Sequence, residues 1–325
     1  MNRRLFGLGV GAGIFGLYFS KELVAAPWPT RPIRWVVPYA PGGLSDTSTR
    51  IVVQKIIELT GWTIVIENKP GANALIGSEY VARAAPDGYT FLNVLAAHSV
   101  NPTLYAGALN FDPLKSLTPV SLVGITPLII AINKALPVKD LKELIAYAKA
   151  NPGKLSYGSS GIGAAAHMAT EQFKTATGID MVHVPYKGSG PALQDLMSNN
   201  IQVLIDTPPT LMPQVRSNNI KALALMSSRR LASAPDVPTI SEASGLDLDC
   251  ATWSMFLTTT GVPKEIINKM AYETKRAVNS PDIQARFEQL GLEPIGSSPE
   301  EASKFLKSEV TKMAVIIQSK NIKPE

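Results

Sequence analysis

The sequence predicts an α/β protein, because two separate parts of the chain share one order of strand, glycine turn and helix. Residues 33–37 have the composition of a buried strand, a Pro/Gly turn follows, and apolar side chains recur with helical spacing at residues 47–60. The same order returns at residues 155–177. Strands that alternate with helices of about 10–15 residues are typical of parallel sheets built from right-handed βαβ units. We therefore expect parallel sheet, with ligands beyond the carboxyl ends of the strands.

The rest of the chain continues this alternation. Further strands are predicted at residues 63–68, 89–95, 120–132, 182–185, 203–205, 222–225 and 252–259. Further helices are predicted at residues 76–84, 138–151, 191–198, 263–279, 283–290 and 299–318. Loops are expected at residues 96–102, 206–209 and 226–247. Gly and Pro interrupt the long apolar strand at residues 124–127, a pattern that suits a connection between two domains.

The first 26 residues have the features of an export signal. Arg3 and Arg4 precede an uncharged run at residues 5–19, and small residues at 24–26 suit a signal-peptidase site. The run is too short for a membrane-spanning helix, which needs about 20 apolar residues. Because the arginine pair partly fits a twin-arginine signal, the Sec and twin-arginine routes both remain open. We expect a periplasmic protein from which residues 1–26 are removed as a signal peptide.

Composition excludes several kinds of site. The net charge of +5 falls to +3 without residues 1–26, which carry three basic residues and one acidic residue, so no nucleic-acid partner is expected. Cys250 is the single cysteine, which excludes an internal disulfide and a cysteine-based zinc site. The three histidines, His98, His167 and His183, stand alone without metal-ligand spacing. We therefore expect no metal and no cofactor.

The turn after the first strand has the features of an anion site. Gly42 and Gly43 lack a β-carbon, so their backbone can approach a ligand closely. The residues that follow are types that begin helices, and a helix start offers unpaired N–H groups and a partial positive charge. Tyr39 is placed to line a pocket there. The alternative is an ordinary turn capped by Asp46, whose carboxylate pairs with Arg50 four residues later.

A second glycine loop at residues 158–163 repeats this arrangement. Ser159, Ser160, Gly161 and Gly163 stand between a strand and a helix start, with no charged side chain among them. The glycine spacing matches neither a dinucleotide fingerprint nor a P-loop, and the nucleophile pattern GxSxG around Ser160 fails at its last glycine. Such a loop can hold an anion without reacting with it. The alternative is a tight turn that binds nothing.

Three further side chains are candidates for the ligand site. His98 lies in a predicted loop after a strand, and His167 lies one turn into the helix after the second glycine loop. Asp206 directly follows another predicted strand. An alternative function is a hydrolase of small esters or amides, with Ser160 as nucleophile, His167 as base and Asp206 as the orienting acid. His167 packed on its own helix, without a ligand, is the other interpretation of that residue.

Blocks of sequence along the mature chain resemble the substrate-binding proteins of tripartite tricarboxylate transporters, the Bug receptors. The blocks are residues 31–33, 37–43 with Asp46 and Arg50, 65–72, 85–90, 101–105, 157–161 with His167, 183–188 and 235–239. They occur in family order as far as about residue 245, and the C-terminal helices fit in length. One departure is Asn73 with Ala74, where the family usually has further glycine, and it bears on the flexibility of that loop.

The resemblance implies an α/β, two-lobed periplasmic binding protein fold of a type II-like kind. Two crossover strands are implied near residues 124–127 and 251–254. Lobe 1 would then be discontinuous, residues 27–124 and 252–325, and lobe 2 would be residues 125–251. The resemblance also implies that the ligand is closed between the lobes and that backbone groups of residues 41–43 and 159–163 hold its carboxylates, partly through water.

From the resemblance we expect a monomeric extracytoplasmic solute-binding protein and not an enzyme. The expected ligand is a small carboxylate, namely a di- or tricarboxylate, an acidic amino acid or an aromatic acid. The expected partners are the membrane subunits of the transporter or the ectodomain of a sensor kinase. The residues expected at the ligand are Tyr39, Gly42, Gly43, Asp46, His98, Ser159, Ser160, Gly161, Gly163, His167 and Asp206.

Overall fold

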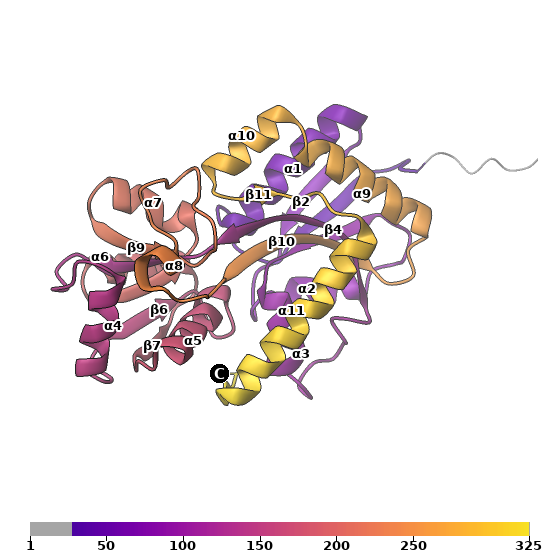
Figure 1. Cartoon of the computed structure of the whole chain (residues 1–325). Coiled ribbons are helices and arrows are strands. Elements are labelled where there is room, and N and C mark those ends of the chain that lie inside the picture. Colours follow the sequence, from indigo (N-terminus) through magenta and orange to yellow (C-terminus); the bar gives the residue numbers. More distant parts are fainter. Residues whose placement is uncertain (1–27, 325) are drawn as a thin grey trace, which may run out of the picture.

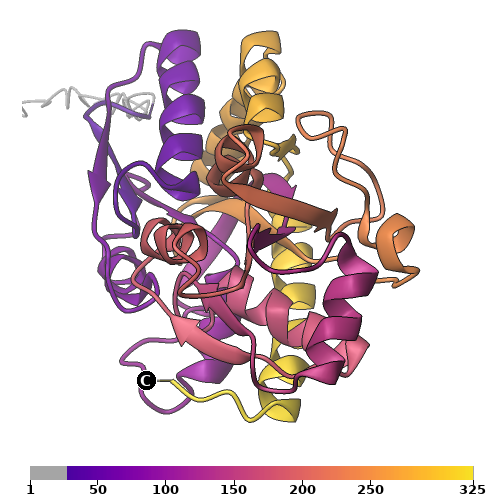
Figure 2. The same ribbon diagram turned by 90° about the vertical axis from the view of Figure 1, so that its left-hand side faces the viewer.

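The computed structural model describes residues 28–324, so the predicted signal peptide at residues 1–26 lies outside the described residues. Two sheets organise this part of the chain, each with helices on both faces (Figure 1). We call each sheet with its helices a lobe, the larger one built on six strands and the smaller one on five. Figure 2 views the molecule from the side of the smaller lobe.

The larger sheet has the strand order β11-β4-β10-β3-β1-β2. Its strands are β1 Ile33–Val37, β2 Ile64–Asn68, β3 Thr90–Val94, β4 Leu117–Pro127, β10 Ala251–Thr259 and β11 Glu293–Pro294. β1 pairs in parallel with β2 and β3, whereas β10 is antiparallel to β3 and β4, and β11 is antiparallel to β4. The expected parallel sheet is therefore present in β1, β2 and β3, and antiparallel strands extend it, because β10 enters this sheet at the end where β4 leaves it.

Helices cover both faces of the larger sheet. On one face α1 Leu44–Thr60, α9 Lys264–Val278 and α10 Pro281–Gln289 pack around Trp35, Phe91 and Phe256. On the other face α2 Leu75–Ala82 and α11 Pro299–Ser319 pack around Leu92 and Trp253. The helix α3 Ala97–Leu104 packs beside α11 and extends this layer toward the smaller lobe.

The smaller sheet has the strand order β7-β6-β8-β5-β9. Its strands are β5 Ile129–Asn133, β6 Ser156–Ser159, β7 Val182–Pro185, β8 Val203–Asp206 and β9 Ile220–Leu225. β6 is parallel to β7 and β8, whereas β5 is antiparallel to β8 and β9. One face is covered by α4 Leu141–Ala150, α5 Ala165–Thr177 and α8 Ile240–Ser244, and the other by α6 Ser189–Met197 and α7 Pro208–Arg216.

Three regions predicted as loops contain helix. Residues 96–102 belong mostly to α3, although Pro102 lies inside it, because apolar contacts with α5 and α11 outweigh the lost backbone hydrogen bond. Pro208 and Pro209 begin α7, where the first helical positions need no N–H partner. The short helix α8 interrupts residues 226–247 behind a reciprocal capping box.

The chain passes between the two sheets twice, and the two passages lie side by side. β4 ends at Pro127, opposite the first residue of β10, Ala251. Just beyond, the N–H of Leu128 donates to the carbonyl of Cys250 over 3.1 Å, and the N–H of Met226 donates to the carbonyl of Leu128 over 2.8 Å. In Figure 1 both β4 and β10 run from one lobe toward the other. Paired backbone therefore joins the lobes. Separately, no helix within residues 28–324 has the length and hydropathy of a membrane span.

Gly124→Ala is expected to lower the free energy of unfolding by about 1–3 kcal/mol, the usual cost of overpacking. An added β-carbon would lie 2.6 Å from the backbone oxygen of Glu293 and 3.0 Å from the Leu292 side chain. Gly43→Ala is the control, because its β-carbon would meet nothing closer than an oxygen at 3.9 Å. Denaturant unfolding measures both changes, and equal stability of the two variants would contradict the close packing of β11 on β4.

Candidate functional site

The turn after β1 leaves the start of α1 without a side-chain cap. Gly42 has a φ of +86°, a left-handed conformation that glycine adopts without strain. Gly43 is the N-cap of α1, so no side chain there covers the first N–H groups of the helix. The expectation that Asp46 caps this helix is wrong, since α1 begins at Leu44 and Asp46 lies in its first turn. The first N–H groups of α1 have no intrahelical partner and no side-chain cap.

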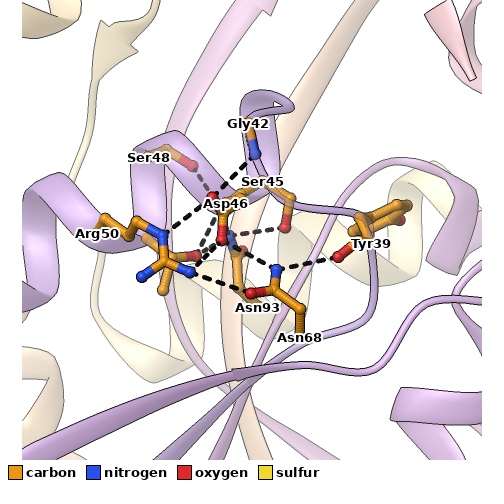
Figure 3. A network of polar contacts seen from close by, with 9 residues as sticks. Tyr39, Gly42, Ser45, Asp46, Ser48, Arg50, Asn68 and Asn93 are labelled. Atoms are coloured by element: carbon orange, nitrogen blue, oxygen red, sulfur yellow. Dashed lines mark hydrogen bonds and ion pairs between the residues drawn. The ribbon is translucent and has the colours of Figure 1, made fainter.

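Asp46 instead holds the turn in place (Figure 3). Its Oδ2 accepts hydrogen bonds from the N–H of Gly42 over 3.0 Å and from Nε of Arg50 over 2.9 Å. Its Oδ1 accepts one from Asn68 over 2.9 Å, and Asn68 also donates to the carbonyl of Tyr39. Burial disfavours the charged form, but these donors outweigh it and hold the pKa of Asp46 below its usual value. The predicted pairing with Arg50 is confirmed, and both carboxylate oxygens are engaged within the lobe.

Asn93 on β3 anchors the same helix start on the sheet. Its Nδ2 donates to the carbonyl of Ser45 over 3.0 Å and to the hydroxyl of Thr49 over 2.6 Å. The hydroxyl of Ser254 on β10 donates to Asn93 Oδ1 over 2.9 Å. All four side chains are buried, so this network ties the start of α1 to β10. β4 and β10, the two strands that pass between the lobes, are called the hinge strands. Sequence reasoning missed Asn93, and the available signal was a polar residue inside an apolar strand.

The second glycine loop follows β6 in the smaller lobe and uses the same device. Gly163 has a φ of +77°, and its N–H donates to Nδ1 of His167 over 3.1 Å. The acceptor therefore lies four residues after the glycine, as Asp46 does after Gly42. The N–H of Gly161 donates to Ser159 Oγ over 3.3 Å. Helix α5 then begins behind Ala164, again without a side-chain cap. The N–H groups of Gly42, Gly161 and Gly163, which were expected at a ligand, thus donate hydrogen bonds within their own loops. The N–H groups in the first turns of α1 and α5 are the ones without an intrahelical partner.

Two histidines brace this second loop. The rings of His167 and His183 stack with centroids 4.0 Å apart, and His183 stacks on Tyr157 at 4.8 Å. Nε2 of His183 lies 2.7 Å from Ser159 Oγ. Because the Ser159 hydroxyl donates to the carbonyl of Gly161, Nε2 is the donor in that pair. Sequence reasoning missed the role of His183, since its partner comes from a different strand.

This arrangement contradicts the hydrolase alternative. Among residues 28–324 the Ser160 side chain forms no hydrogen bond, and Nδ1 of His167 is occupied by the N–H of Gly163. Asp206 accepts hydrogen bonds from Thr207 and does not orient His167. The serine that does meet a histidine, Ser159, accepts from that ring and has no base to take its proton.

The two lobes contact each other at the second glycine loop and at the start of α7, among other places. A β-carbon at Gly163 would lie 2.8 Å from Leu104 and 3.0 Å from Val100, both on α3 of the larger lobe. A β-carbon at Gly291 would lie 3.0 Å from Pro208, at the start of α7 in the smaller lobe. The second glycine loop is therefore packed against the opposite lobe.

His98 and Asp206 are buried at the ends of strands. His98 is 1% exposed in the first turn of α3, and Asp206 is 5% exposed as the last residue of β8. Burial lowers the pKa of His98 to about 4, so its ring is neutral at pH 7, and burial raises the pKa of Asp206. Neither belongs to a metal cluster, since the described residues contain no group of three His, Cys, Asp or Glu placed to hold a metal.

A cavity of about 530 Å³ lies on the opposite face of the hinge strands. Ile125, Ala251 and Trp253 line it together with α5, α11 and residues 227–231, whereas the next residue, Ser254, contacts the Asn93 network. Successive side chains of a strand point to opposite faces, which separates the two environments. None of the predicted site residues lines this cavity. The cavity therefore lies apart from the start of α1, and it reaches α5 at that helix's first residue, Ala165.

Lowering the pH from neutral to about 4.5 is expected to reduce the free energy of unfolding, partly through His167. Burial lowers the pKa of His167 to about 4, below its ordinary value of 6.5, with Glu171 opposing and Lys174 reinforcing the shift. Between these values the unfolded state binds more protons, so stability is complete above pH 6.5 and falls as pH falls toward 4. Protonation also removes the acceptor for the N–H of Gly163. His167→Gln keeps an acceptor and is expected to flatten the slope by up to about 1.4 kcal/mol per pH unit.

Urea unfolding at several pH values measures the two slopes. Burial also lowers the pKa of His183 and His98 to about 4, so the variant is expected to keep part of the acid sensitivity. An identical slope in wild type and His167→Gln would show that the His167 ring is not held neutral by its surroundings.

Comparison with known proteins identifies the family. Residues 49–322 match the tripartite tricarboxylate transporter family receptor, TctC. The structure of the periplasmic binding protein BugD is 32% identical, with 92% of this chain and 100% of that chain covered and a TM-score of 0.82. Rpa4515 of R. palustris, solved with adipate, is also 32% identical, with 92% and 100% covered and a TM-score of 0.85.

MatC from Rhodopseudomonas palustris, with bound malate, is 28% identical, with 89% of this chain and 100% of that chain covered and a TM-score of 0.80. These structures confirm the predicted two-lobed periplasmic binding protein fold. The chain therefore belongs to the tripartite tricarboxylate transporter receptor family, whose members bind solutes and are not enzymes.

Proposed function

We propose that this receptor captures a small carboxylate between its two lobes and delivers it to the membrane subunits of a tripartite transporter. The observation that carries the proposal is the pair of uncapped helix starts, α1 in the larger lobe and α5 in the smaller lobe. Each follows a strand at its carboxyl end, where α/β sheets bind ligands. Two relatives are solved with adipate and malate, and both of these ligands carry two carboxylates. One helix start for each carboxylate suits such a ligand.

The proposed contacts are the N–H groups in the first turns of α1 and α5. Those of Gly42, Gly161 and Gly163 donate within their loops, and this internal bonding orients the helix starts. A partly buried helix start contributes up to about 2 kcal/mol to binding an anion. A carrier must release its load, so micromolar affinity, about −8 kcal/mol, is sufficient. Contacts from the second lobe add to this when the lobes close.

The proposed ligand site includes the residues expected from the sequence, with roles adjusted to their contacts. Asp46 and His167 position their loops, because each accepts the N–H of the glycine four residues earlier. The residues proposed to lie at or beside the ligand are Tyr39, Gly42, Gly43, His98, Ser159, Ser160, Gly161, Gly163 and Asp206.

The proposal extends to organisation and partners. The proposed division is lobe 1 at residues 27–124 with 252–325 and lobe 2 at residues 125–251, which places the last three residues of β4 and the first residue of β10 in lobe 2. The receptor is proposed to act as a monomer. Family membership favours transporter subunits as the membrane partner, with a sensor kinase ectodomain as the second candidate. Di- and tricarboxylates, acidic amino acids and aromatic acids form the ligand panel, which a thermal-shift screen of the leaderless protein ranks directly.

Gly43→Val is expected to abolish measurable binding while the lobes stay folded. The backbone of Gly43 is extended, with a φ of −78°, and a β-carbon there would meet nothing closer than the carbonyl of Ala40 at 3.9 Å. The fold therefore tolerates a side chain, which would occupy the space in front of the α1 helix start. Calorimetry with the best ligand from the screen measures the loss.

Lys187→Ala is the matched control for Gly43→Val. Lys187 is an exposed loop residue, and removal of such a charge is expected to cost less than about 1 kcal/mol of binding. Loss of binding in Lys187→Ala together with normal binding in Gly43→Val would show that a charged side chain, and not the helix starts, holds the ligand carboxylate.

The periplasmic form is expected to begin near Pro27. Arg3 and Arg4, the uncharged run and the small residues at 24–26 motivate this expectation. Intact-mass spectrometry of protein from the periplasmic fraction measures the N-terminus. A soluble periplasmic form that retains Met1 through Ala26 would contradict cleavage.

A further inference from the structure

Two buried ionisable side chains carry a polar atom that nothing in the described part of the chain satisfies. The atoms are Nε2 of His98 and Oδ2 of Asp206. Buried polar atoms without a partner are rare in native proteins, and each requires a physical explanation. His98 stands just beyond β3 in the larger lobe, and Asp206 ends β8 in the smaller lobe. Both therefore belong to the edges on which the proposed ligand site is built.

Asp206 lies on the strand beside the second glycine loop. β8 pairs in parallel with β6, with Leu204 opposite Gly158, so Asp206 is level with Ser160. Adjacent strands lie about 4.8 Å apart. Two residues further along, Pro208 packs against the larger lobe. Asp206 is thus placed between the second glycine loop and a contact between the lobes.

Only one half of the Asp206 carboxylate is satisfied. Its Oδ1 accepts hydrogen bonds from the N–H of Thr207 over 2.6 Å and from the Thr207 hydroxyl over 3.3 Å. The hydroxyls of Ser189 and Thr210 lie close enough to this carboxylate to lower its pKa, against the larger effect of burial, but neither meets the geometry of a hydrogen bond at Oδ2. Among residues 28–324 no cationic side chain contributes to the environment of this carboxylate. Oδ2 therefore lacks both a donor and a counter-charge.

A donor on the ligand would satisfy this oxygen, whereas a ligand carboxylate placed against it would be repelled. We propose that Oδ2 of Asp206 accepts a hydrogen bond from a hydroxyl or ammonium group on the carbon beside a ligand carboxylate. The receptor then prefers hydroxy- or amino-substituted dicarboxylates to unsubstituted ones. This inference rests on the proposed function, because it concerns the same site and assigns the class of ligand.

Calorimetry of the mature protein with succinate, malate and aspartate tests the inference. These four-carbon dicarboxylates differ only at carbon 2, which carries hydrogen, hydroxyl or ammonium. Malate or aspartate is expected to bind at least about tenfold more tightly than succinate, because a site built around a ligand donor rejects the analogue that lacks it. The ratio between malate and aspartate separates hydroxyl from ammonium recognition. Glutarate, 2-hydroxyglutarate and glutamate repeat the comparison with five carbons.

Asp206→Asn is the matched variant, since the amide oxygen keeps the contacts with Thr207 and an N–H donor replaces Oδ2. The preference for aspartate over succinate is expected to disappear, with a ratio of dissociation constants within about twofold of one, because an ammonium group cannot accept from the new N–H, whereas the malate hydroxyl can. Ser78→Ala is the control, because Ser78 Oγ is also buried without a partner but lies on α2. Its ratio is expected to equal that of wild type, and circular dichroism establishes that both variants are folded.

The outcomes separate this inference from the proposed function. Succinate bound as tightly as malate and aspartate by wild type, or a preference for aspartate that is unchanged in folded Asp206→Asn, overturns the role of Asp206 and leaves the receptor function standing. No binding by any member of either set or of the wider carboxylate panel overturns the proposed function, and this inference with it. The wild-type comparison needs no variant, so it decides the ligand class even if Asp206→Asn does not fold.

Discussion

The antiparallel pairing of β4 with β10 is the interaction on which the two-lobed arrangement depends. It runs from Leu117 opposite Thr259 to Pro127 opposite Ala251, so the strands that complete the larger sheet also carry the chain to the smaller one. Because side chains alternate along a strand, the pair presents one face to the start of α1 and the other to the hinge cavity. Both environments are therefore positioned by the same backbone hydrogen bonds.

The two loops beyond the strands follow from a shared local rule. In each, a glycine N–H donates to a side chain four residues later, which lies in the first turn of the following helix. Asp46 and His167 differ chemically, but each accepts the glycine N–H hydrogen bond that would otherwise be available to a ligand. The next N–H groups, in the first turn, are left without an intrahelical partner and without a side-chain cap. In the proposed function, anion recognition by the helix starts is then a property of the backbone and needs no Arg or Lys.

Buried polar groups with all their hydrogen bonds made and buried polar groups with one missing have different roles in the proposed site, the first as framework and the second as ligand contact. Asn93 is fully buried, and its amide is engaged by Ser45, Thr49 and Ser254, so it acts as framework. Asp206 is buried nearly as well, yet one of its oxygens has no donor in the described chain. An unmade hydrogen bond in a buried place costs about 1–3 kcal/mol, which binding of a matching group would recover. This contrast singles out Asp206 among the ionisable residues of the smaller lobe.

The sequence by itself determined the features that depend on near neighbours along the chain. Apolar spacing and glycine turns were sufficient to predict β1, most of α1 and α11. The sequence blocks that occur in family order were sufficient to predict the family. Local rules failed where packing overrides them, as in α3 around Pro102. Only the tertiary structure decided that β10 runs antiparallel, that Ser159 meets His183 rather than Ser160 meeting His167, and that Asp206 keeps an unpaired oxygen. Those partners lie on different strands, and only the folded packing of the strands sets which side chains come within hydrogen-bonding distance.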